Sequence, residues 1–262
     1  MLVYSRPPYP SYMYDQFTAY PYLLINAFDE TTLNYINYRS ARFIKSIIVD
    51  SGVHSIFHKY ELQEYPGGYQ TWTDKVARLW RIVSKLVADS YVVVPDYPSD
   101  YHNNPVDDNV ERTFRNIEYA IKRHPDVKWI IPLQGKKDDI LSIIKSFEYI
   151  KDLGILDRYN YIAIAPTCAT NNTKFLTDVA QIIWKRTKLI KKDNHYIKIH
   201  MFGATMKAWK SIAPFVDSTD TIVVNYICKT MIGSMCTKKA EKEKAWKMFL
   251  EKVSKIAATK RL

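Results

Sequence analysis

The sequence predicts an α/β fold, a (β/α)8 barrel, and three observations lead to that expectation. Short apolar segments typical of strands alternate with longer segments whose apolar residues recur at helical spacing. The strand segments are nearly continuous apolar runs, as expected for a parallel sheet covered on both faces. About seven or eight such units in a chain of 262 residues fit a closed TIM-type barrel better than a doubly wound open sheet, which is the alternative.

The chain divides into three parts: an N-terminal arm (1–21), a barrel domain (22–236) and a C-terminal basic helix (237–262). The arm is rich in proline and tyrosine and has no apolar core of the kind found in signal peptides, so we expect it to be extended. In the C-terminal segment, Ala245, Phe249, Val253 and Ile256 fall on one helical face. We expect that face to pack against the barrel.

In the first half of the barrel, apolar runs predict strands at 22–28, 43–50, 91–96 and 127–135. Helical spacing predicts helices at 31–41, 73–90 and 106–125. The last of these has acidic residues in its first turn and basic residues in its last, as the helix dipole favours. Proline and glycine at 66–68 indicate a long loop over 59–70.

The second half continues the alternation. We predict, in order, a helix at 137–155, a strand at 159–167, a helix at 173–190, a strand at 195–203, a short helix at 205–213 and a last short strand at 214–220. Gly154 closes the first of these helices.

Composition narrows the class of protein. The net charge of +11 favours a polyanionic partner, nucleic acid before an anionic membrane. The three cysteines, Cys168, Cys228 and Cys236, form no close pair with metal-ligand spacing, so we expect reduced thiols, no metal and no disulfide framework. No apolar run reaches the ~18 residues of a membrane span. A cytoplasmic protein is expected.

Four predicted strands end on side chains that hydrogen-bond well: Asp50, Asp96, Gln134 and Asp217. A single aspartate at a strand end is commonly a helix cap or a turn former. In a parallel barrel, however, the C-terminal ends of all strands lie on one rim, and active sites are built on that rim. Burying several carboxylates there costs free energy unless a ligand or function compensates. The sequence therefore predicts an active site, provided that the four side chains face one pocket.

Six short motifs occur in one order: VDSG at 49–52, PD at 95–96, LQG at 133–135, IAIAPT at 162–167, KIHMFG at 198–203 and VDST at 216–219. This order resembles the tRNA-guanine transglycosylase superfamily, which includes phage and archaeal members that place 7-deazaguanines in DNA. The resemblance covers about residues 22–224. It implies a (β/α)8 barrel and an enzyme, a pentosyltransferase, that exchanges guanine for a 7-deazaguanine through a covalent aspartyl-sugar intermediate.

The resemblance also implies roles for individual residues. Asp217 matches the nucleophile, with Asp220 as its rival three residues on, and Asp50 matches the general acid/base. Asp96 matches the carboxylate that accepts hydrogen bonds from the guanine-like edge, and Gln134 matches the side chain that reads the base carbonyl. The remaining positions expected to line the substrate pocket are Ser51, Gly52, Gly135, Ala165 and His200.

The sequence departs from the family pattern in three places. Val53, His54 and Ser55 replace a glycine and a glutamine, and Ala165-Pro166 replaces a Gly-Gly turn. The zinc segment that follows the family's barrel is absent. The acceptor could therefore be DNA as well as tRNA. These departures fit a minimal or viral-type member of the family, located in the host cytoplasm. Two alternatives stay open: a catalytically decayed barrel that binds nucleic acid, and an unrelated barrel hydrolase.

Candidate nucleic-acid contacts form a basic run at a helix end: Lys185, Arg186, Lys188, Lys191 and Lys192. Such a run can track a phosphate backbone or form an ordinary solvated face. Tyr69, Trp72 and Tyr97 could stack on a base, with core packing as the alternative for Trp72. The expected partners are DNA or tRNA and guanine or 7-deazaguanine, with no cofactor and no membrane. A homodimer is left open.

Overall fold

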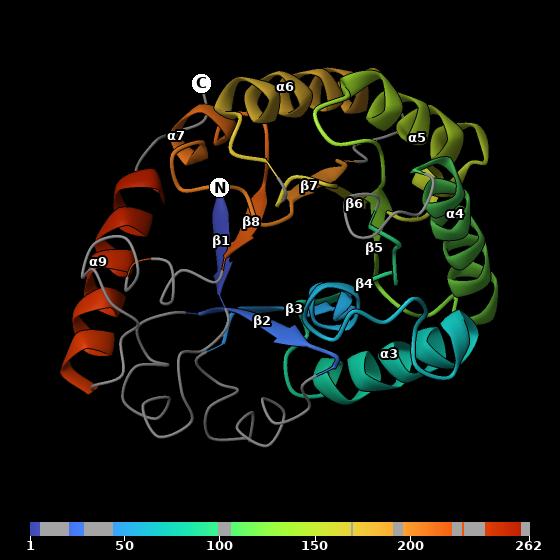
Figure 1. The fold of residues 1–262 in the computed structure, drawn as a ribbon, viewed down its shortest axis with the longest axis horizontal. Helices are drawn as coiled ribbons and strands as arrows, with labels where there is room; N and C mark the ends of the chain where they lie inside the picture. Colours follow the sequence, from blue (N-terminus) through green and yellow to red (C-terminus); the bar gives the residue numbers. More distant parts are fainter. Residues whose placement is uncertain are drawn as a thin grey trace.

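Eight parallel strands close into a barrel in chain order, with helices on its outside (Figure 1). This computed structural model describes residues 1–5, 21–28, 44–98, 106–168, 170–190, 196–221, 227 and 239–257. The predicted (β/α)8 barrel is confirmed. The strands are β1 (Leu2–Ser5), β2 (Tyr22–Asn26), β3 (Ser46–Asp50), β4 (Ser90–Val93), β5 (Trp129–Leu133), β6 (Tyr161–Ile164), β7 (Lys198–Met201) and β8 (Ser218–Thr221).

The helices between the strands cover the barrel. The longer ones are α3 (Gly68–Ser84), α4 (Val106–Arg123), α5 (Ile140–Asp152), α6 (Thr173–Leu189) and α9 (Lys239–Ala257). Three shorter ones are η3 (His54–Lys59), η4 (Ile155–Asp157) and α7 (Trp209–Ile212). No helix in these described ranges is long and apolar enough to cross a membrane. The helix predicted at 31–41 lies outside the described residues.

The first residues of the chain belong to the barrel. Strand β1 pairs with β8 from Leu2 opposite Ser218 to Ser5 opposite Thr221, and Ser5 also pairs with Leu23 of β2. The prediction that 1–21 is an arm outside the barrel is therefore wrong at its start. The reason is that a four-residue strand inside a segment rich in proline and tyrosine leaves too short an apolar run to be recognised.

The last strand begins later than its apolar pattern indicates. We expected a strand over 214–220, but β8 starts at Ser218, where the ladder pairs Ser218 with His200 of β7. Val216 instead is buried in the core ahead of the strand. This shift decides which aspartate stands at which end of β8.

The side chains form two apolar layers. Between strands and helices lies a large core that includes Ile47, Val92 and Ile162. Inside the barrel lies a smaller cluster, made of Tyr4, Leu24, Ile48, Val93, Ile130, Tyr161 and Ala163. Because these side chains fill the interior, the barrel is a packed core and not a channel. Any site must therefore be built at its ends.

Two outer segments refine the expectations from sequence. Helix α3 begins at Gly68, after Gly67 with φ 76°, so part of the predicted loop at 59–70 is the first turn of this helix. Helix α9 places Ala245 and Phe249 in the core, with Val253 and Ile256 partly buried against it.

Candidate active site

The first carboxylate, Asp50, is the last residue of β3. It pairs in the ladder with Asn26, the last residue of β2, and its carbonyl oxygen accepts a hydrogen bond from the Ala27 N–H at 2.9 Å. Gly52 then turns the chain with φ +85°, and a Cβ at this position would lie 3.0 Å from Asn26 Oδ1. The positive φ favours glycine here, and a larger residue would in addition crowd Asn26. Asp50 therefore stands on the C-terminal rim of the barrel, as predicted.

Asp96 and Gln134 form a buried pair on the same rim. Gln134, directly after β5, donates from Nε2 to Asp96 Oδ2, which lies just after β4. Asp96 is 3% exposed and Gln134 1% exposed. Burial raises the pKa of Asp96 to about 6, although the hydrogen bond from Gln134 acts in the opposite direction. Gln134 Oε1 is buried and has no hydrogen-bond partner among the described residues. Gln134 Oε1 is thus a hydrogen-bond acceptor that could bind a ligand donor.

Aromatic rings hold these strand ends together. Tyr65 donates its hydroxyl to the Asp96 carbonyl oxygen, and Trp72 Nε1 donates to the Ser51 carbonyl oxygen at 2.9 Å. Burial raises the pKa of Tyr65 well above its usual value, and the charges of Asp96 and, more weakly, Asp50 add to that shift. Both carboxylates therefore lie within electrostatic range of one hydroxyl.

Tyr69, Trp72 and Tyr97, the candidates for base stacking, contact other aromatic rings of the protein. Trp72 and Tyr97 are buried core residues, and Trp72 stacks on Tyr65 with ring centroids 6.0 Å apart. Tyr69 is partly buried and meets the Tyr119 ring edge-on at 5.8 Å. Stacking on a base by Trp72 or Tyr97 would require these rings to leave the core.

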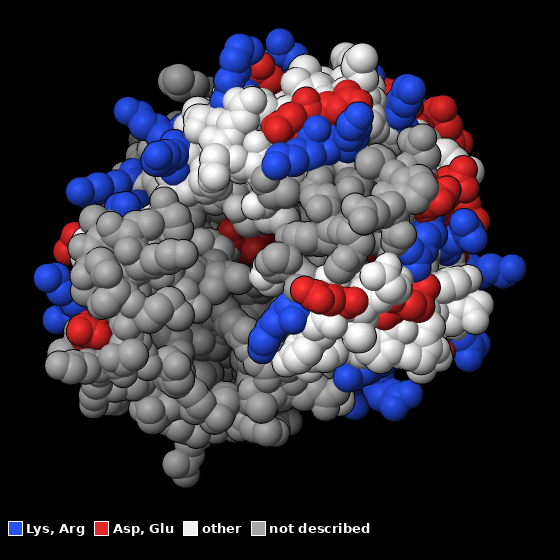
Figure 2. Space-filling model, in the orientation of Figure 1, with Lys and Arg blue, Asp and Glu red and all other residues white. Residues whose placement is uncertain are grey.

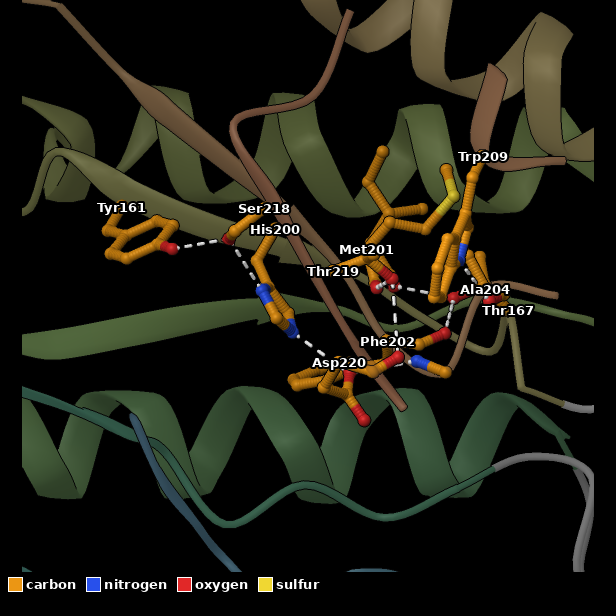
Figure 3. A network of polar contacts seen from close by, with 12 residues as sticks. Tyr161, Thr167, His200, Met201, Phe202, Ala204, Trp209, Ser218, Thr219 and Asp220 are labelled. Atoms are coloured by element: carbon orange, nitrogen blue, oxygen red, sulfur yellow. Dashed lines mark hydrogen bonds and ion pairs between the residues drawn. The ribbon is translucent and has the colours of Figure 1, made fainter. Parts of the chain in front are cut away.

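Asp220 lies near the C-terminal end of β8 and is held firmly at one oxygen. Its Oδ1 is 3.0 Å from His200 Nε2 and accepts a hydrogen bond from the Gly203 N–H at 2.8 Å (Figure 3). The Asp220 side chain is 15% exposed, whereas the His200 side chain is fully buried. Across the described part of the chain, no hydrogen bond reaches Asp220 Oδ2. One carboxylate oxygen is therefore fixed while the other remains available to a ligand.

Asp217 lies at the opposite, N-terminal end of the same strand. Its Oδ1 accepts a hydrogen bond from the Tyr196 hydroxyl and its Oδ2 one from the Ile199 N–H, both at 2.8 Å. The prediction that Asp217 shares a rim with Asp50, Asp96 and Gln134 is wrong, because β8 begins after Asp217 and not before it. The rim position belongs to Asp220, which the sequence offers only as the rival.

The other residues predicted to line the pocket mainly allow close packing or form backbone hydrogen bonds. A Cβ on Gly135 would lie 2.6 Å from Ser142 Oγ and 2.7 Å from Ile143 Cγ1, so the glycine allows α5 to approach. Ser51 is fully buried, and the buried Ala165 donates its N–H to the Leu133 carbonyl oxygen at 3.1 Å. Contact of these residues with a substrate stays a prediction.

The basic run on α6 lies away from this rim. Arg186 forms an ion pair with Glu148 of α5, and Lys188 Nζ lies 4.7 Å from the centroid of the Tyr196 ring. Because Tyr196 bonds Asp217, this helix end belongs to the N-terminal side of the barrel. Lys185 is exposed, and Lys191 and Lys192 lie outside the described residues. The described part of the basic run, Lys185 to Lys188, and the C-terminal rim are thus on different sides.

Figure 2 shows basic and acidic side chains together over the outer helices, and further acidic atoms in a recess near the middle of this face. In the parts of the chain that the structure describes, no three His, Cys, Asp or Glu side chains are grouped to hold a metal ion. Cys168 is exposed, and Cys228 and Cys236 lie outside those parts.

Comparison with models of known protein families gives no match, and comparison with curated proteins gives none either. The features that point to a function are therefore the fold, the geometry of the C-terminal rim and the order of the six motifs.

Proposed function

We propose that this chain is a base-exchanging transglycosylase that acts on nucleic acid, with Asp220 in place of Asp217 as its nucleophile. The observation that carries the proposal is the geometry of Asp220. Two N–H groups hold one of its oxygens, the side chain is 15% exposed, and the residue lies on the same C-terminal rim as Asp50, Asp96 and Gln134. Active sites of parallel barrels are built on this rim.

The covalent step uses two carboxylates with separate tasks. Asp220 Oδ2 attacks the sugar carbon C1′, and the bond from C1′ to the guanine nitrogen breaks. The electron pair of that bond stays on the guanine nitrogen, which takes a proton from Asp50. In the return step, the incoming 7-deazaguanine gives its N–H proton to Asp50. Its nitrogen then attacks C1′ and releases the Asp220 carboxylate.

Asp96 and Gln134 are suited to select the base. A guanine edge carries N–H donors, which the Asp96 carboxylate accepts, and a carbonyl oxygen, which the Gln134 amide can read. With its pKa near 6, Asp96 is mostly ionised at neutral pH and accepts strongly. Because both side chains are buried, a base reaches them only after the groups that cover them move aside.

The net charge of +11 supports a polyanionic acceptor. Lys136 and Lys137 are exposed and directly follow Gln134 and Gly135 at the C-terminal end of β5. We propose that they contact the phosphate backbone, in preference to the basic run on α6.

The test is base exchange with labelled guanine and with a labelled 7-deazaguanine, each offered with duplex DNA and with tRNA in parallel. We expect label to enter one of the two polymers and Asp220→Asn to abolish uptake. Asp217→Asn is the matched control, since it changes the same chemical group on the other end of the strand. A folded protein that binds nucleic acid but labels neither polymer would contradict the proposal and favour a non-catalytic binding barrel.

A further inference from the structure

A line of polar side chains runs from the barrel interior to Asp220. The Tyr161 hydroxyl lies 2.6 Å from Ser218 Oγ, Ser218 Oγ lies 2.7 Å from His200 Nδ1, and His200 Nε2 lies 3.0 Å from Asp220 Oδ1 (Figure 3). Tyr161, Ser218 and His200 are all buried. The line therefore has one end in the core and one end on the rim.

The protons available allow one complete arrangement. An ionised Asp220 only accepts, so the His200 proton must lie on Nε2. If His200 is neutral, Nδ1 accepts the Ser218 proton and Ser218 Oγ accepts the Tyr161 proton. Each donor in the line then has an acceptor, which buried polar groups require.

A doubly protonated His200 breaks this arrangement. Nδ1 would then donate to Ser218 Oγ, and the proton of either Ser218 or Tyr161 would have no acceptor within the described line. The ring would also be a buried cation, enclosed by Tyr4 at 6.3 Å, Tyr161 at 6.4 Å and Phe202 at 5.1 Å between ring centroids. The charged group that contacts it is Asp220.

We infer that Ser218 and Tyr161 are positioning residues that hold His200 as the neutral tautomer with its proton on Nε2, directed at Asp220. In this state His200 orients the carboxylate without neutralising it, so Oδ2 keeps its charge for attack. The link to catalysis rests on the proposed function. The tautomer of His200 follows from the hydrogen-bond geometry and an ionised Asp220, whatever reaction the protein catalyses.

The barrel contains its own control. Tyr4 and Ser46 form a second buried pair, with the Tyr4 hydroxyl 2.8 Å from Ser46 Oγ, and Ser46 donates to the Asp89 carbonyl oxygen at 2.9 Å. Ser46 is as buried as Ser218 but makes no hydrogen bond with His200 among the described residues. Replacing either serine by alanine thus removes the same group from the same kind of surroundings.

The tautomer can be read from nitrogen-15 NMR of protein labelled at histidine. The chain has six histidines, and His200→Gln identifies the signal of interest. At pH 7.5 we expect a protonated Nε2 and an unprotonated, hydrogen-bonded Nδ1. Ser218→Ala should move the Nδ1 signal towards that of an unbonded nitrogen, and Ser46→Ala should leave it unchanged. A proton on Nδ1 in the wild type, or equal effects of both variants, would overturn the inference.

A second measurement concerns the rate. In the covalent step of base exchange, Ser218→Ala should lower kcat about tenfold with little change in KM, the size expected for one lost hydrogen bond. Ser46→Ala should stay within about twofold of the wild type, and equal losses in the two variants would overturn the positioning role. If the wild type shows no exchange at all, the proposed function fails, while the NMR result still decides the tautomer.

Discussion

Asp217 and Asp220 lie three residues apart in the sequence but at opposite ends of β8. Asp217 Oδ2 accepts a hydrogen bond from the Ile199 N–H near the start of β7, whereas Asp220 Oδ1 accepts one from the Gly203 N–H beyond the end of β7. The first aspartate is thus positioned to close the N-terminal end of the barrel. The second stands on the C-terminal rim, the end where parallel barrels build their active sites.

Asp217→Ala should lower the free energy of unfolding by about 1–3 kcal/mol, because it leaves the Ile199 N–H without its acceptor in a buried position. Urea denaturation measures this change. Asp152→Ala, at the exposed end of α5, is the control and should have little effect. Equal stability of the two variants would show that Asp217 is not a structural residue.

Asp96 should make stability fall as pH rises. Its folded pKa is raised from 3.8 to about 6, so its favourable contribution is complete below pH 3.8 and is lost as pH rises through 6. A shift of about two units corresponds to about 3 kcal/mol. Asp96→Asn, which cannot ionise, should therefore match the wild type near pH 4 and exceed its free energy of unfolding by up to that amount at pH 8.

Urea denaturation at both pH values tests this prediction on Asp96. A wild type that gains stability over Asp96→Asn between pH 4 and pH 8 would mean that the carboxylate is stabilised by an ion pair. In base exchange, the same variant should lose selectivity for guanine, because an amide replaces the acceptor for the N–H donors of the base.

Nucleic-acid binding should weaken as salt rises, through release of counterions. Lys136→Ala with Lys137→Ala should lower affinity and reduce the salt slope by about one to two, since these lysines follow the rim residue Gln134. Lys185→Ala with Lys188→Ala removes the same charge from the other side of the barrel and should change affinity little. Fluorescence titration of both double variants at two salt concentrations shows which end of the barrel binds nucleic acid. A larger loss of affinity in the Lys185/Lys188 variant than in the Lys136/Lys137 variant would place the nucleic acid on α6.

The parts of the fold that the sequence predicts are those where hydropathy and backbone pairing agree. Strand β3 is an apolar run that ends on its first charged residue, so Asp50 could be placed on the rim from the sequence. The same reasoning located Asp96 and Gln134 close to the ends of β4 and β5.

Strand β8 could not be placed in this way because its residues, Ser218 to Thr221, are polar although half of them are buried. Their hydroxyls are satisfied inside the fold: Ser218 contacts Tyr161 and His200, and Thr219 Oγ1 donates to the Met201 carbonyl oxygen at 2.7 Å. These partners come from other strands, so no local pattern reveals them. The apolar residues just before β8 therefore led to a strand predicted too early in the chain. That early strand placed the predicted nucleophile at Asp217.

The attack of Asp220 on a sugar carbon is tested most directly by trapping the covalent adduct and locating it. The wild type, Asp217→Asn and Asp220→Asn are each incubated with the polymer that accepts label, denatured and digested, and the peptide that carries a nucleotide is identified by mass spectrometry. We predict a sugar attached to Asp220 in the wild type and in Asp217→Asn, and no adduct in Asp220→Asn. An adduct on Asp217 or Asp50, or one that persists in Asp220→Asn, would contradict this assignment.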